Sequence, residues 1–108
     1  MTVDELFEHV SQRFLAEEAD VEQGRMFSAV GLKTAGKFFA FARRGELVVK
    51  LPAERVDELV AGGKGHRFDP GHGRLMREWA TLQPGDEAAC AAYVGEARDF
   101  VAAQAKGA

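Results

Sequence analysis

The sequence predicts an α+β fold, a two-layer sandwich in which helices cover an antiparallel sheet. Apolar residues recur at helical spacing near the start, in the middle and at the end of the chain, and short aromatic and β-branched runs fill the intervals. Tight turns join most of these runs and only one helix separates them, which favours antiparallel pairing over a doubly wound sheet. The expected order is helix, three strands, helix, two strands, helix, within one domain of 108 residues.

The first helix is predicted from Thr2 to about Glu18. Thr2 and Glu5 have the spacing of a capping box, in which each side chain bonds the backbone N–H of the other residue. The apolar residues that follow at helical spacing are Val3, Leu6, Phe7, Val10 and Phe14. The acidic outer face of this helix is interpreted as solvated surface.

Three strands are expected next, over residues 25–32, 37–43 and 46–51. The connections "KTAG" and "RG" between them are typical of hairpins. In the middle strand, a period of two places Phe39 and Phe41 on one face and Phe38 and Ala40 on the other. Phe38 is therefore expected to be partly exposed.

The second half of the chain is expected to hold a helix over 52–61, a strand over 66–68, a turn over 69–73, a strand over 74–82 and a helix over 87–104. Pro52 suits the first turn of a helix, and Gly62 and Gly63 end it. In the last strand, alternation places Arg77 and Trp79 on the same face. The single cysteine, Cys90, falls on the inward stripe of the final helix and is predicted to be a core thiol.

Charge and cysteine content bear on location and partners. The net charge is −3, yet residues 1–23 carry seven acids and one base, whereas residues 24–50 carry six bases and one acid. A lone cysteine cannot form an intramolecular disulfide, and no apolar run has the length of a signal peptide core or of a membrane span. A cytoplasmic protein with no membrane association is expected.

Two groups of residues are candidates for binding. Arg74, Arg77 and Trp79 cluster near the end of the sheet, and Arg and Trp dominate protein interfaces. Trp79 could equally be a core-edge residue with Arg77 packed along it. Arg43 and Arg44 belong to the basic sheet over residues 25–50, where phosphate contacts and stacking on Phe38 would suit a nucleic acid.

A metal site is a further, weaker candidate. His66, Asp69 and His72 have nitrogen and oxygen donors suited to zinc or iron, but the intervening Pro and Gly residues forbid the helix that would align them. No nucleophile with a neighbouring base is present, and no glycine loop has the spacing of a phosphate-binding motif. We therefore expect no enzyme and no cofactor.

Several motifs together resemble the TfoX N-terminal domain family. They are a Met-Phe pair at 26–27, Gly36 before the second hairpin arm, Lys-Leu-Pro at 50–52, and Met76 with Trp79. The motifs cover about residues 20 to 82, and the order of elements extends over the whole chain. This resemblance implies a fold like that of secretion chaperones.

The resemblance also implies a function. The family takes its name from regulators of natural competence, which are thought to act with a transcription factor and carry a second, C-terminal domain. This chain ends at Ala108, so a stand-alone domain is expected. We expect a non-enzymatic binding module with a protein partner, an accessory in transcription or competence-type regulation. Nucleic-acid binding through the basic sheet is the alternative, followed by a metal-dependent enzyme that would use His66, Asp69 and His72. The sheet edges could also pair two copies of the chain.

Overall fold

The computed structural model describes residues 1–26, 29–71, 73 and 75–107, which form three helices and a six-stranded sheet. In chain order the elements are α1 (Val3–Glu17), β1 (Val21–Met26), β2 (Ala29–Thr34), β3 (Lys37–Arg43), β4 (Glu46–Lys50), α2 (Ala53–Ala61), β5 (Gly65–Phe68), β6 (Met76–Leu82) and α3 (Glu87–Gly107).

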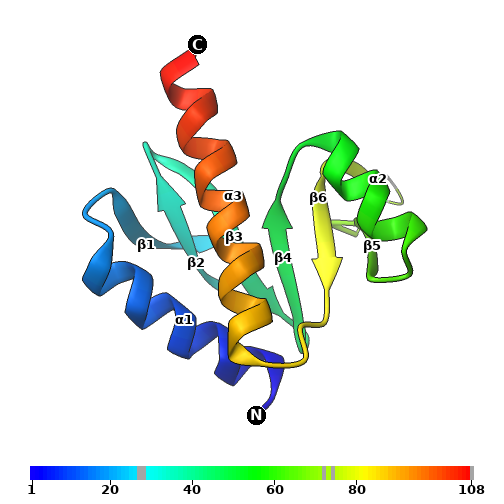
Figure 1. Ribbon diagram of the computed structural model, residues 1–108, viewed down its shortest axis with the longest axis horizontal. Coiled ribbons are helices and arrows are strands. Elements are labelled where there is room, and N and C mark those ends of the chain that lie inside the picture. The colour runs from blue at the N-terminus through cyan, green and yellow to red at the C-terminus, as the bar shows by residue number, and fades with distance from the viewer. Residues whose placement is uncertain (27–28, 72, 74, 108) are drawn as a thin grey trace.

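The sheet is antiparallel throughout, with the strand order β1-β2-β3-β4-β6-β5. The helices form a second layer: α1 and α3 lie across the central strands, and α2 lies beside β5 and β6 (Figure 1). Arg55 of α2 donates two hydrogen bonds to Glu96 of α3, at 2.9 and 3.2 Å, and so ties these two helices together. The predicted α+β two-layer class is confirmed.

The sheet has one strand more than the sequence predicts. Residues 25–32 do not form a single strand, because β1 and β2 pair as a hairpin in which Met26 is opposite Ala29. Phe27 and Ser28, which join them, lie outside the described residues. The strand β1 was missed because Glu22, Gln23 and Gly24 give it no apolar alternation, as is common for an edge strand.

A β-bulge overturns the predicted faces of β3. Leu32 pairs with Ala40 but its neighbour Lys33 pairs with Phe38, so Phe39 is the extra residue. A bulge places two residues of one strand opposite one residue of the next and shifts the alternation. Phe39 and Ala40 consequently share the helix-covered face, and Phe41 lies on the opposite face with Phe38. Phe38 is half-buried, as expected.

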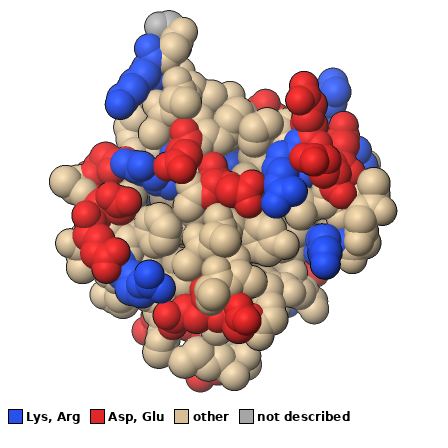
Figure 2. All heavy atoms as spheres, in the orientation of Figure 1, with Lys and Arg blue, Asp and Glu red and all other residues tan. Residues whose placement is uncertain are grey.

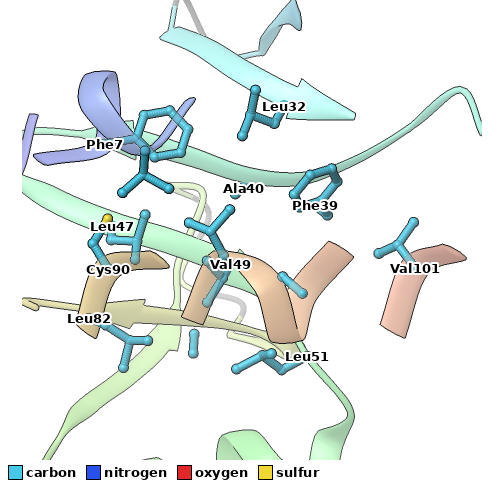
Figure 3. Close-up of a cluster of buried hydrophobic side chains, with 14 of the residues drawn as sticks. Phe7, Leu32, Phe39, Ala40, Leu47, Val49, Leu51, Leu82, Cys90 and Val101 are labelled. Carbon is cyan, nitrogen blue, oxygen red and sulfur yellow. The ribbon is translucent and has the colours of Figure 1, made fainter. Parts of the chain in front are cut away.

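The main core lies between the sheet and the helices. Leu6 and Val10 of α1 and Cys90 and Val101 of α3 pack against strand residues that are at most 6 % exposed. Figure 3 shows part of this cluster, with Phe39, Val49 and Leu82 contributed by the sheet. A second, smaller cluster on the opposite face contains Phe41, Val48, Phe68 and Trp79.

The ends of the helices follow from local chemistry. Thr2 Oγ1 accepts a hydrogen bond from the Glu5 N–H at 3.1 Å, and Glu5 Oε1 accepts one from the Thr2 N–H at 2.8 Å, which confirms the predicted capping box. The final helix continues to Gly107, three residues beyond the predicted Gln104. Within the described part of the chain, every helix is too short or too polar to cross a bilayer.

Candidate binding face of the sheet

The face of the sheet opposite α1 and α3, here called the open face, carries most of the predicted binding residues. Strand pairing places Trp79 beside Lys50, and Thr81 between Val48 and His66, all on this face. Arg43 also belongs to it, since its guanidinium carbon lies 5.8 Å from the centre of the Phe68 ring. Predicted binding residues line two of the hollows at this face.

The first, the Trp79 hollow, has a volume of about 570 Å³. It is lined by Lys50, Pro70, Leu75, Met76, Arg77, Glu78 and Trp79. Leu75 is 56 % exposed and Met76 is 36 % exposed, so this hollow has an apolar rim that faces solvent. Lys50 and Arg77 place two cations beside that rim.

Trp79 itself is only 7 % exposed. Its ring centre lies 5.8 Å from that of Phe41, and Phe41 makes an edge-on contact with Phe68 at 5.6 Å. Trp79 is therefore packed as a residue at the edge of the core, which was one of the two interpretations of the sequence. It also lines the hollow. Arg74, the third residue predicted at this edge, lies outside the described residues.

Leu75 and Met76 were not predicted as site residues. The strand β6 begins at Met76, two residues later than predicted, so Leu75 precedes the strand and Met76 is its first residue. The sequence does show two adjacent apolar residues, Leu75 and Met76, directly after a turn. Strict alternation along a strand, however, assigned them to opposite faces of the sheet.

The second hollow, the His66 hollow, is smaller, at about 110 Å³. Its lining residues are Arg43, Arg44, Glu46, Val48, His66, Phe68, Asp69 and Thr81. The structure thus brings Arg43 and Arg44, predicted for nucleic acid, next to His66 and Asp69, predicted for metal. The β3–β4 turn makes this possible, because Arg44 adopts a left-handed φ of 54° beside Gly45.

The proposed metal ligands do not gain support from this arrangement. Within the described ranges, no group of three or more His, Cys, Asp or Glu side chains could hold a metal ion. His72, one of the three predicted ligands, lies outside those ranges. Asp69 instead accepts a hydrogen bond from the Gly71 N–H at 2.8 Å, which shapes the turn.

Charge is segregated between the two layers of the molecule. The open face carries Lys33, Arg43 and Lys50, with Glu22 and Glu46 among them, and Arg77 and Glu78 both line the Trp79 hollow. The helix layer carries more acids than bases, and Figure 2, which views the molecule from the helix side, shows carboxylates at the left, at the upper right, near the centre and toward the bottom, with Lys and Arg side chains among them. The helix layer is therefore the more acidic side, and the open face carries a small excess of cations.

The cysteine offers no nucleophile to this face. Cys90 of α3 is fully buried between this helix and the sheet. Burial raises the pKa of its thiol to about 11, because the charged thiolate is poorly solvated there. The predicted core thiol is confirmed.

Comparison of the chain with protein-family models, with curated proteins and with solved structures found no match.

Proposed function

We propose that this protein is a non-enzymatic binding module that recognises a protein partner at the Trp79 hollow. The partner segment presents an apolar side chain flanked by carboxylates. The observation that carries this proposal is the exposure of Leu75 and Met76 directly beside Lys50 and Arg77.

The apolar part of the hollow suits a side chain of a partner. Among the described residues, large hydrophobic side chains are exposed at only four positions, and two of them, Leu75 and Met76, are adjacent. Exposed apolar patches with polar rims are characteristic of interaction sites. The buried Trp79 also lines the hollow and packs in the second cluster, and well-packed surroundings are typical of binding hot spots.

The cations at the rim select the charge of the partner. Lys50 and Arg77 line the hollow together with one acid, Glu78, so the local balance is positive. Charge complementarity of this kind mainly speeds association and excludes partners of the wrong sign. An acidic segment with an apolar anchor fits both features of the hollow.

The resemblance to the TfoX N-terminal domain family suggests the cellular process in which this interaction takes place. We propose that the module is an accessory in transcription or competence-type regulation and acts in the cytoplasm. The free, buried thiol of Cys90 is compatible with a reducing compartment.

Nucleic acid is less well suited to the open face than a protein. Single strands bind by stacking bases on exposed aromatic rings. On the open face Phe41, Phe68 and Trp79 are at most 7 % exposed, and Lys33 Nζ lies 5.9 Å from the centre of the half-buried Phe38 ring. The aromatic side chains described here are thus engaged in packing.

The test is site-specific photocrosslinking in the cells that produce the protein. Leu75 is replaced by p-benzoylphenylalanine in one variant, and the exposed Ala92 of α3, on the helix side, is replaced in the control. We expect a discrete, nuclease-resistant protein adduct from position 75 only. Arg77→Glu should reduce that adduct at least about five-fold, and Lys106→Glu, the same charge change at the exposed end of α3, should not.

Two results would overturn the proposal. Equal adducts from positions 75 and 92 would show that the hollow has no preference for a partner. Adducts that disappear on nuclease treatment would assign the open face to nucleic acid instead. Trp79 is left unchanged in this design, because truncating a buried aromatic residue would disturb the fold.

A further inference from the structure

A third hollow lies on the helix side of the sheet, away from the open face. It has a volume of about 350 Å³ and lies between α1 and the strands β1, β2 and β3. We call it the Ser11 hollow, and its lining residues are Asp4, Phe7, Glu8, Ser11, Gln12, Gln23, Val30 and Ala42. Its volume is at the lower end of the range of small-molecule sites.

A buried polar atom marks this hollow. Ser11 is 4 % exposed, and its Oγ has no hydrogen-bond partner within the described part of the chain. Buried polar groups are nearly always satisfied, and an unsatisfied one destabilises the fold. A ligand that hydrogen-bonds the Ser11 hydroxyl would remove this cost.

The walls next to Ser11 are apolar. Phe7 is buried, Ala42 is half-buried, and Val30 is 44 % exposed although it lies on the helix-covered side of the sheet. The exposure of Val30 shows that α1 leaves this end of β2 uncovered. An apolar body of modest size would cover Val30 and contact Phe7 at the same time.

The charge of the hollow is negative. Asp4 and Glu8 lie one helical turn apart on α1 and both line the hollow, so their carboxylates lie on one side of it. Gln12 and Gln23 add neutral amides, and the described lining residues include no Lys, Arg or His. These groups favour a cation over an anion.

We propose that the Ser11 hollow binds a small amphipathic amine. The apolar body of the ligand packs against Phe7 and Val30, and its ammonium group donates hydrogen bonds toward the carboxylates and the Ser11 hydroxyl. This site is separate from the Trp79 hollow, since the two lie on opposite faces of the sheet.

Three matched probes test the charge preference: phenethylamine, 2-phenylethanol and 3-phenylpropionate, which share a phenyl ring and differ in the polar group. Each is titrated into the ¹⁵N-labelled full chain and followed by NMR. Phenethylamine should shift the amides of Ser11, Gln23 and Val30 with a dissociation constant of about 1 mM, a realistic affinity for so small a molecule. The alcohol should bind more weakly and the carboxylate should not bind.

Variants then assign the contacts. Ser11→Ala should weaken phenethylamine binding about five-fold through loss of one hydrogen bond. Val30→Lys, which brings a cation to the hollow, should abolish it, and Ala92→Lys, the same added charge on the outer face of α3, should leave it unchanged.

The proposal fails if phenethylamine shifts no amide of the hollow. It also fails if the three probes bind equally, or if Val30→Lys binds phenethylamine as well as the unmodified chain does. A Val30→Lys chain whose spectrum shows an altered fold is replaced by Asp4→Asn with Glu8→Gln, which should remove the preference for the amine over the alcohol.

Discussion

Among single residues, the buried side chains of Cys90 and Ser11 differ in whether they need a hydrogen-bond partner. Cys90 has weak hydrogen-bonding capacity and behaves as a small hydrophobe, so its complete burial needs no partner. Ser11 has a hydroxyl that needs a partner and has none among the described residues. The helical stripe of α3 predicted the burial of Cys90, whereas the period of α1 could not show that Ser11 is buried, because serine was not counted among its apolar positions.

Ser11→Ala should therefore stabilise the unliganded protein. Removing an unsatisfied buried hydroxyl is expected to raise the free energy of unfolding by about 1 kcal/mol. Thr2→Ala, in the same helix, should instead lower it by about 1 kcal/mol, because it removes the capping hydrogen bond. Urea denaturation of both variants measures these changes. A loss of stability in Ser11→Ala would mean that the hydroxyl is satisfied in solution.

At the scale of elements, irregular pairing decides what each face carries. The bulge at Phe39 moves one phenylalanine into the main core and leaves Phe41 for the second cluster. Without this bulge, the open face would lack the ring that contacts both Phe68 and Trp79. A bulge depends on how two strands meet, so the alternation of residues within β3 alone could not reveal it.

The pairing of the edge strand β5 with β6 also requires the backbone of Gly65 to lie very close to the backbone of Thr81. A Cβ atom added at Gly65 would lie 2.2 Å from the backbone oxygen of Thr81, and no real Cβ contact is so short. Glycine therefore allows β5 to pair with β6 and to bring His66 and Phe68 to the open face.

Gly65→Ala should lower the free energy of unfolding by about 2 kcal/mol and shift the amide signals of His66 and Phe68. The matched control is Gly85→Ala, because a Cβ at Gly85 would meet nothing within 4 Å. That control should change stability by less than about 0.5 kcal/mol. Equal effects of the two variants in urea denaturation and NMR would contradict the proposed role of the close approach.

At the scale of the whole molecule, an ion pair connects the two layers. Asp20, in the connection between α1 and β1, accepts hydrogen bonds from Arg98 of α3 at 2.7 and 3.0 Å. It also accepts one from the buried Thr34 hydroxyl of β2 at 2.8 Å. Hydrogen bonds from Arg98, and then from Thr34, lower the pKa of Asp20 to about 2.

This pKa predicts a pH dependence of stability. Because the pKa is lower in the folded state, the contribution of Asp20 is complete above the unfolded value near 4 and is lost as the pH falls toward 2. Asp20→Asn should cost about 1 kcal/mol at pH 6, a figure reduced because the pair is partly exposed, and little at pH 2. Urea denaturation at both pH values measures this.

The control for this experiment is Asp99→Asn. Asp99 also pairs with Arg98, at 3.0 Å, but its side chain is 73 % exposed, so its loss should change stability little at either pH. An Asp20→Asn variant whose deficit is the same at pH 6 and pH 2 would show that the carboxylate does not titrate as the contacts imply.

The fold class, the helices and most of the strands follow from local patterns in the amino-acid sequence. Their apolar periods and caps are local properties of the chain, as the Thr2 capping box and the buried stripe with Cys90 show. The edge strand β1 escaped prediction because an edge strand needs no apolar alternation.

The composition of the candidate site, in contrast, depends on the tertiary structure. It buried Trp79, exposed Leu75 and Met76, and joined Arg43 with His66 across β4 and β6. It also placed Lys33, Arg43 and Lys50 on the open face, away from the acids of the helices. These features depend on strand order, a bulge and a close approach of two backbones, and none of them is a local property of the chain.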